Sequence, residues 1–214
     1  MMDFLSTRAL VEKFEEGGPM MWPLLICSVL ALMVIIYKVI AFALAQGNTD
    51  RFLADVEKFL ARGETDQARA LCLSLRGPVA QVTLAAIDSG SFDRATILEA
   101  AEEAGVRQVS WLEGWLPLLS TVAGIAPLMG FLGTVTGMIR AFEGIRTAEV
   151  LRPDAVAGGI GEALITTATG LIIAIPCLAA YNYFVSRVKG FTLEMERASN
   201  HVAQVMVQET PHEA

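Results

Sequence analysis

Three long stretches of the chain carry almost no charge, and this pattern limits the possible fold more than any other feature. The first runs from Met20 to Ala45 with Lys38 as its single charged residue, the second covers 115–139 and has none, and the third covers 155–186 and has only Glu162. A helix rises about 1.5 Å per residue, so about 20 residues cross a hydrocarbon layer about 30 Å thick. The sequence therefore predicts three transmembrane helices.

The segments between these stretches show helical rather than strand periodicity. We therefore expect an all-α, polytopic membrane protein in which two of the three transmembrane helices extend into a helical cytoplasmic region. In chain order, the expected parts are an amphipathic or interfacial segment at 1–19, the first span at 20–45, a cytoplasmic helical region at 46–113, the second span at 114–139, a short periplasmic connector at 140–154, the third span at 155–186, and a cytoplasmic C-terminal helix and tail at 187–214.

The expected cytoplasmic region divides into four helices at breaker residues. The first is stopped near Gly63, and the second begins with Thr65 as its N-cap and ends before Gly77-Pro78. The third begins with Pro78, and the fourth helical pattern runs from Asp93. Because no strong breaker precedes Trp111, we expect the fourth helix to continue directly into the second span.

The distribution of Lys and Arg favours an outside N-terminus and an inside C-terminus. Basic residues follow the first and third spans, as the positive-inside rule requires for cytoplasmic segments. Arg140, Arg146 and Arg152 in the connector favour the opposite orientation. Because more basic residues follow the first and third spans than lie in the connector, we expect the N-terminus outside and the C-terminus inside.

Composition argues against several functional classes. A net charge of −7 and a pI near 4.9 do not suit nucleic-acid binding. Cys27, Cys72 and Cys177 have neither disulfide-framework nor metal-ligand spacing. The two histidines, His201 and His212, lie in the tail, and neither a phosphate-binding loop nor a second membrane acid is present. We therefore expect no enzymatic activity, no cofactor and no metal site.

The second span has one face made of small residues. Around a helix with about 100° per residue, Gly130 and Thr134 lie within about 40° of each other, and larger apolar side chains occupy the opposite side. Such a face lets another helix approach closely, within one subunit or between subunits. The residues expected to pack helices are Ala126, Gly130, Gly133 and Gly137, together with Gly170 in the third span, and Pro127 and Pro176 are expected to bend their helices. The Thr134 hydroxyl has two explanations, a bond to its own helix or a place beside an ion path.

Glu162 is the sharpest functional signal in the chain. If the third helix begins near Asp154, Glu162 lies about 12 Å along it. A carboxylate at membrane depth costs several kcal/mol unless it is paired, protonated or hydrated, so it is a functional candidate by default. The alternative is that the span begins at Ala163 and leaves Glu162 at the interface. Thr166 and Thr169 share the Glu162 face, which suits a proton or ion path.

Two motifs resemble a known family. "IAPLMGFLGTVTGMIRAF" followed by "GGIGEALITTATGLIIAIPCLAAYNYF" resembles the paired signature of the MotA/TolQ/ExbB proton-channel family, and most closely its ExbB/TolQ branch. The resemblance covers roughly residues 17–190. It implies a bacterial inner-membrane protein that forms a homopentamer around two copies of an ExbD/TolR-like partner, which has a single span with a membrane Asp. The complex is expected to act indirectly on a TonB/TolA-like protein.

The resemblance also assigns residues to a proton pathway. By motif these are Thr134, Glu162 and Thr167, with Thr166 and Thr169 nearby on the same helix. On the helical wheel, Thr167 lies about 140° from Glu162, so the two side chains point in different directions. We therefore expect Thr167 to meet Thr134 between two helices while Glu162 faces the lumen.

The expected function is that of a pore-forming or stator subunit of an inner-membrane motor driven by the proton motive force. The motor would energise outer-membrane processes, either TonB-dependent transport or Tol-type envelope maintenance. The alternatives are a gliding- or flagellar-type stator subunit, an ion or solute channel that acts alone, or a passive membrane scaffold that packs helices through small residues.

Overall fold

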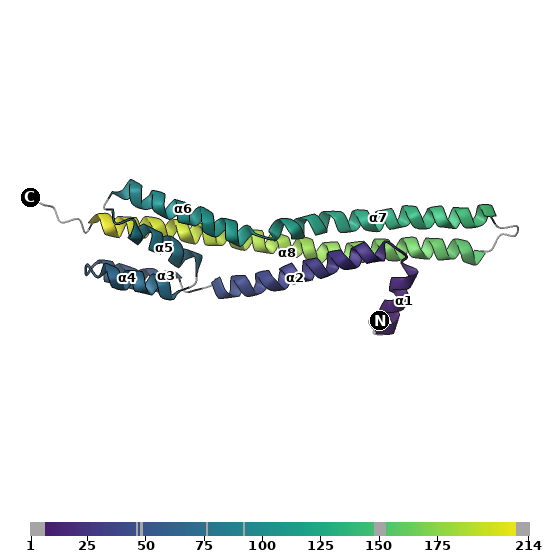
Figure 1. The fold of residues 1–214 in the computed structure, drawn as a ribbon, viewed down its shortest axis with the longest axis horizontal. Helices are drawn as coiled ribbons and strands as arrows, with labels where there is room; N and C mark the ends of the chain where they lie inside the picture. The colour runs from purple at the N-terminus through teal and green to yellow at the C-terminus, as the bar shows by residue number, and fades with distance from the viewer. Residues whose placement is uncertain are drawn as a thin grey trace, which may run out of the picture. The chain divides into compact units, whose positions relative to one another are not determined.

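The protein is described from a computed structural model, and the description covers residues 7–45, 47, 49–75, 77–91, 93–147 and 153–208. Within these ranges the regular secondary structure is helical, which confirms the expected all-α class. The helices are α1 (Thr7–Glu16), α2 (Met21–Ala45), α3 (Thr49–Leu60), α4 (Thr65–Ser74), α5 (Pro78–Asp88), α6 (Arg94–Glu113), α7 (Leu116–Thr147) and α8 (Pro153–Gln208) (Figure 1).

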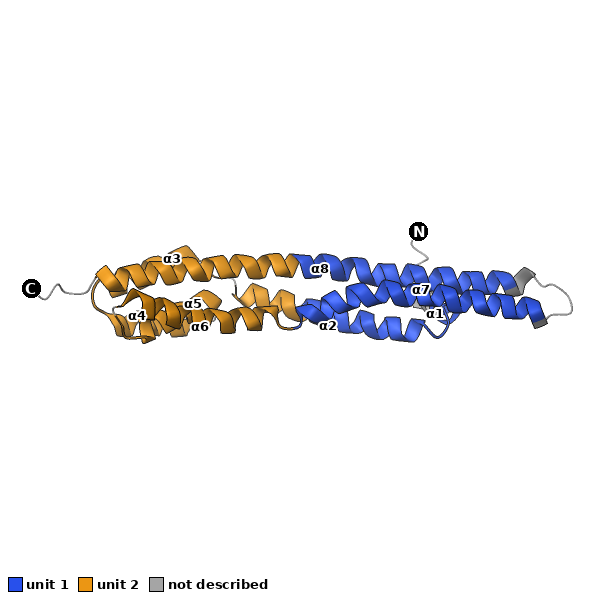
Figure 2. Ribbon diagram, turned by 90° about the horizontal axis from the view of Figure 1, so that it is seen from above, with its two compact units in different colours: residues 1–36, 115–182 blue, residues 37–114, 183–214 orange. Residues whose placement is uncertain are grey.

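The helices form two compact units, which Figure 2 shows in different colours. Unit 1 contains Met1–Ile36 and Trp115–Asn182, and unit 2 contains Tyr37–Gly114 and Tyr183–Ala214. The long helices α2 and α8 each contribute one part to each unit. Among the residues that the structure describes, three helical segments, one including each of α2, α7 and α8, are long and apolar enough to cross a membrane. This agrees with the three spans expected from hydropathy.

Unit 1 has a narrow buried centre and an apolar outer surface. Met21 and Leu24 of α2 pack with Ala126 of α7 and Ala174 of α8. Many large apolar side chains of α7 and α8 are exposed, including Phe131, Leu128, Leu164, Ile172 and Ile175. An exposed apolar surface of this extent is unfavourable in water and suits contact with lipid.

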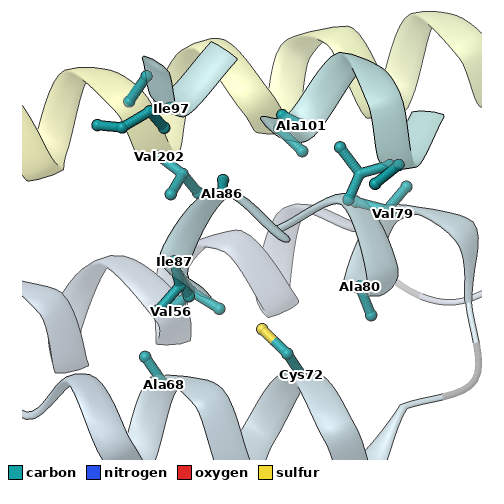
Figure 3. Packing of buried hydrophobic residues seen from close by; sticks show 14 of the residues in the cluster. Val56, Ala68, Cys72, Val79, Ala80, Ala86, Ile87, Ile97, Ala101 and Val202 are labelled. Carbon is teal, nitrogen blue, oxygen red and sulfur yellow. The ribbon is translucent and has the colours of Figure 1, made fainter. Parts of the chain in front are cut away.

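Unit 2 has a conventional hydrophobic core. Helices α3 to α6 pack together with the C-terminal part of α8, and side chains from all five helices enter the same cluster. Figure 3 shows Val56, Cys72, Ile87, Ile97 and Val202 of this cluster, one from each helix. The polar segment of the sequence therefore folds as a helical bundle that the C-terminal helix completes.

Two helix starts in unit 2 show what the sequence indicates well and what it does not. The fourth helix was expected from Asp93, and Asp93 is its N-cap, because its carboxylate accepts a hydrogen bond from the Thr96 N–H at 3.0 Å. The prediction for α4 was wrong by one residue. Glu64 occupies the N-cap position without a side-chain cap, and Thr65 is already inside the helix.

The predicted direct continuation of the fourth helix into the second span was also wrong. Helix α6 ends at Glu113, and a turn at Gly114 and Trp115 precedes α7, with Trp115 at φ 68°. Pro117 accounts for the break, since it has no N–H to donate to the Glu113 carbonyl four residues earlier and its ring would clash with that carbonyl.

Lys38 stabilises the end of α6. Its side chain is only 2% exposed, and its ammonium donates a hydrogen bond to the Leu112 carbonyl at 2.6 Å. The last carbonyls of a helix lack partners in the helix itself and carry partial negative charge, so a lysine there is favourable. The single charged residue of the first uncharged stretch is thus a partner for a helix end.

Several predicted features concern the chain around the connector. Helix α7 continues to Thr147 and α8 begins at Pro153, so 140–147 are helical, and 148–152 lie outside the described residues.

Pro127 and Pro176 lie inside α7 and α8, which continue through both positions. That these prolines bend their helices stays a prediction.

Candidate functional site

Helices α7 and α8 of unit 1 run side by side and approach closely at glycines (Figure 1). A Cβ atom added at Gly137 would lie 2.7 Å from the Gly159 carbonyl oxygen, and one added at Gly170 would lie 2.5 Å from the Ala126 carbonyl oxygen. Real Cβ atoms essentially never make contacts under 3.0 Å. The two backbones therefore meet at a distance that only glycine permits.

The small face expected on the second span lies on this contact. A Cβ at Gly130 would be 3.0 Å from the Thr166 carbonyl oxygen, and one at Gly133 would overlap the Thr166 side chain. Ala126 is fully buried there. The structure thus brings Ala126, Gly130, Gly133, Gly137 and Gly170 together within one chain. Packing of small residues between two membrane helices gains van der Waals contact without help from hydrophobic exclusion of water.

Glu162 forms an ion pair across the two helices. Arg140 of α7 donates a hydrogen bond from Nη1 to Glu162 Oε1 of α8 at 2.6 Å. The Glu162 side chain is 15% exposed and the Arg140 side chain 49%. An opposite charge at hydrogen-bonding distance offsets much of the cost of enclosing the carboxylate.

The turn between α1 and α2 lies against this ion pair. Gly18 has φ 68°, a conformation that L side chains rarely adopt. A Cβ there would overlap Glu162 Oε1 and would be 3.3 Å from Arg140 Nη1. Glycine at this position therefore allows the backbone to lie directly beside the carboxylate.

Arg140 was not predicted as a site residue, because the expected end of the second span at residue 139 assigned it to the connector. The position of Arg140 in the sequence nevertheless indicated that it could pair with a membrane acid. Arg140 directly follows the uncharged stretch 115–139, and α7 continues beyond it to Thr147. A basic residue inside a helix, close to the level of the only acidic residue on the next span, is a candidate ion-pair partner.

The threonines of the proposed path bond to backbone carbonyls. Thr134 donates to Phe131 O at 2.6 Å on its own helix. Thr167 donates to Gly130 O of α7 at 3.2 Å and to Ala163 O of α8 at 3.1 Å. Thr167 thus bonds to α7 one turn before Thr134, whereas Thr134 bonds to the preceding turn of its own helix.

Thr166 and Thr169 differ in their surroundings although both follow Glu162 on α8. Thr166 is 0% exposed, packs into the notch at Gly133, and donates to the Glu162 and Ala163 carbonyls at 3.0 Å each. Thr169 is partly buried and donates to Ile165 O at 2.8 Å. A threonine that bonds to the preceding turn carries its hydroxyl through an apolar environment at low cost.

The chemistry available at this site is the binding and release of a proton. The carboxylate of Glu162 is its acidic group, Arg140 supplies a fixed positive charge, and the Thr166 hydroxyl bonds to the Glu162 carbonyl. Within the described ranges of the chain, no group of three or more His, Cys, Asp or Glu side chains has an arrangement that could hold a metal ion.

Residues 74–197, more than half of the 214 residues, match the model of the MotA/TolQ/ExbB proton channel family. The chain belongs to this family. The matched segment contains α5, α6 and α7 and most of α8, and so includes Arg140, Glu162 and the four threonines. The resemblance seen in the two sequence motifs is thereby confirmed, including its ExbB/TolQ branch.

Named relatives of the chain come from the same branch of the proton channel family. An ExbB-like biopolymer transport protein of Synechocystis sp. is 32% identical over 193 residues, covering 85% of this chain and 72% of the relative. The Tol-Pal system protein TolQ of Pseudomonas aeruginosa is 46% identical over 81 residues, covering 38% and 35%. The biopolymer transport protein ExbB of Pseudomonas putida is 35% identical over 96 residues, covering 45% and 29%.

Family membership and the three apolar helices together make the chain a multi-pass protein of the inner membrane. The long match to the Synechocystis relative spans most of both chains, whereas the TolQ and ExbB matches span 35% and 29% of those two proteins. Membership in a proton channel family also places the chain among transport components rather than in a known class of enzymes.

Proposed function

We propose that the chain is the pore-forming or stator subunit of an inner-membrane motor driven by the proton motive force. In this proposal it assembles as a homopentamer around two copies of an ExbD/TolR-like subunit with a membrane Asp. The assembly then energises an outer-membrane process through a TonB/TolA-like protein, as in TonB-dependent transport or Tol-type envelope maintenance. The N-terminus is periplasmic and the C-terminus cytoplasmic.

The observation that carries this proposal is the position of Glu162. It is the single charged residue of the stretch 155–186, its side chain is 15% exposed, and it is held by a charge on the neighbouring helix. An ionisable group in such a segment is costly to keep and marks a proton or ion path in many membrane proteins. A helix that served only to anchor the chain would gain stability from an apolar residue at this position.

The hydroxyls near Glu162 support a path along the contact of α7 and α8. Thr134 and Thr167 lie on opposite helices and are both partly accessible, so we assign them to the path with Glu162. Thr169, about two turns from Glu162 and also partly accessible, extends this row. Thr166 is enclosed against Gly133, so we assign it to helix packing.

The deciding experiment replaces Glu162 by Gln, which keeps its size and removes its acidity. We expect the Glu162→Gln variant to assemble normally and to lose energy transduction in cells, measured as uptake of a TonB-dependent substrate and as resistance to detergent. Glu196→Gln is the matched control, because it makes the same chemical change at an exposed position of α8 in unit 2. The control should transduce normally. Normal transduction by Glu162→Gln contradicts the proposal.

Co-purification separates the proposed motor from a passive scaffold and from a channel that acts alone. A single-span protein with an acidic membrane residue is expected to copurify with the chain, and native mass spectrometry then counts both subunits. A complex of five copies with two copies of the partner agrees with the proposal. Isolation of the chain alone, combined with normal transduction by Glu162→Gln, favours the scaffold.

A further inference from the structure

Arg140 and Glu162 form a pair in which only one member is readily accessible. Nearly half of the Arg140 side chain is exposed, whereas Glu162 is largely enclosed. The guanidinium group does not lose its charge in proteins, and its hydrogen bond to a carboxylate is stronger than a bond between neutral groups. While the pair is formed, Nη1 occupies one acceptor site of Oε1, and the charge of the guanidinium favours the ionised carboxylate over the protonated acid.

The Gly18 turn closes a second side of the same oxygen. The space that a side chain at Gly18 would take is filled by Glu162 Oε1 and, 3.3 Å away, by Arg140 Nη1. The neighbouring Gly17 is buried, and its missing side chain would meet Met21 and Ile165. Backbone from the turn before α2 and a cation from α7 therefore enclose one carboxylate of α8.

We propose that Arg140 is a positioning residue that holds Glu162 closed against the Gly18 turn, and that this pair must open before Glu162 takes up a proton. The inference rests on the proposed role of Glu162 in the proton path. The hydrogen bond from Nη1 breaks as the pair opens, and protonation then turns the carboxylate into a neutral carboxylic acid, while the guanidinium keeps all its own protons. The half-exposed arginine is the member that moves away, since its long side chain reaches the surface.

The closed pair makes the resting assembly resistant to proton leakage. A proton that approaches Glu162 meets a permanent positive charge and finds one of the two carboxylate oxygens already bonded. Removal of Arg140 leaves the same carboxylate without its competing donor. Loss of the arginine is therefore expected to raise proton flux, whereas loss of an ordinary structural ion pair would lower the stability of the assembly and leave its flux unchanged.

The test measures proton flux through the purified assembly in proteoliposomes that contain a trapped pH-sensitive dye, with a potassium diffusion potential as the driving force. We expect Arg140→Gln to raise the flux by about ten- to a hundredfold, the range that corresponds to losing one hydrogen bond to a charged group from the closed state. The double variant Arg140→Gln with Glu162→Gln should return to the background rate. Arg140→Lys should keep most of the closure because it retains a donor and a charge.

Two further variants control for charge and for folding. Arg146→Gln removes an exposed arginine from the same helix and should leave the flux unchanged. Gly18→Ala keeps every charge but displaces the Glu162 carboxylate, so it should raise the flux as well. Size-exclusion chromatography verifies assembly in each case, and if Arg140→Gln does not assemble, the Gly18→Ala variant decides.

The inference fails if Arg140→Gln assembles with wild-type flux, or if its extra flux persists when Glu162 is also replaced. Its failure is distinct from failure of the proposed function. If Glu162→Gln abolishes transduction in cells while Arg140→Gln and Gly18→Ala leave the flux unchanged, the proton path stands and only the closing role of Arg140 is lost. If Glu162→Gln transduces normally, the path itself is wrong.

Discussion

Cys72 shows how the core of unit 2 controls the chemistry of a single residue. Its side chain is fully buried in the cluster that contains Val56, Ala68 and Ile87 (Figure 3). Burial, with a smaller contribution from the negative charge of Asp88, raises the pKa of the Cys72 thiol from its ordinary value of 9.0 to about 12. The thiolate is the reactive form of cysteine, so this residue is expected to be chemically inert in the folded protein.

This raised pKa predicts how Cys72 reacts and how unit 2 responds to alkali. With Cys27 and Cys177 replaced by Ala, alkylation of Cys72 at about pH 8 should be roughly a thousandfold slower in the folded protein than in urea, because the thiolate fraction falls tenfold for each unit by which the pKa rises. The folded state favours the neutral Cys72 thiol, and this preference adds to the free energy of unfolding. The contribution is complete below pH 9.0 and is lost as the pH rises towards about 12. Equal alkylation rates with and without urea would show that the core does not enclose the thiol.

At the scale of elements, the contact between α7 and α8 depends on glycines in two different ways. Gly137 and Gly170 face backbone atoms of the other helix, which cannot move aside without shifting the whole helix. Gly124 on α7 has no neighbouring atom within 4 Å of the position where its Cβ would lie. The same residue type therefore has a strict packing role at some positions of α7 and none at others within this chain.

Gly137 and Gly124 of α7 provide a matched pair of glycine-to-alanine substitutions, one at the interhelical contact and one away from it. We expect Gly137→Ala to lower the stability of the folded protein by about 1–3 kcal/mol, because the added methyl group would force the helices apart at the Gly159 carbonyl. Gly124→Ala should be neutral or slightly stabilising, since alanine favours the helix by up to about 1 kcal/mol over glycine. Thermal unfolding in detergent micelles measures both. A similar loss in the two variants would mean that helix propensity rather than interhelical contact governs α7.

The elements that the sequence predicted well are those determined by local pattern. Helix α5 begins at Pro78 as its proline indicated, and α6 begins at Arg94, beside the Asp93 from which its helical pattern was expected to run. The same holds for the three apolar spans, whose length and lack of charge follow from the hydrocarbon layer. In each case the residues that determine the feature lie within the segment itself or directly beside it.

The features that the sequence did not reveal depend on residues far apart in the chain. Lys38 bonds to Leu112, 74 residues away, and Arg140 pairs with Glu162, 22 residues away. Periodicity predicts which side chains share one face of a helix, but it does not predict which residues of another helix pack against that face. The predicted meeting of Thr134 and Thr167 stays a prediction, and within this chain the hydroxyl of Thr167 bonds to the Gly130 carbonyl of α7.

At the scale of the whole molecule, the charges are unevenly divided between membrane and water. The bundle of unit 2 carries many ionisable side chains on its surface, whereas the described spans of unit 1 have few. Basic residues follow the first and third spans, and by the positive-inside rule such segments stay in the cytoplasm. Arg140, Arg146 and Arg152 oppose this assignment, so the orientation rests on a balance of charges that an experiment can decide.

Cysteine labelling in spheroplasts tests the orientation directly. In a background without the three native cysteines, one variant carries Glu99→Cys on the exposed surface of α6 and another carries Arg146→Cys in the last turn of α7. A membrane-impermeant maleimide should label Arg146→Cys in intact spheroplasts and Glu99→Cys only after permeabilisation. The reverse pattern would place unit 2 in the periplasm and would mean that the connector arginines, rather than those after the first and third spans, determine the orientation. An inner-membrane motor of the proposed kind would then present its helical bundle to the outer membrane, and the direction of proton entry towards Glu162 would be inverted.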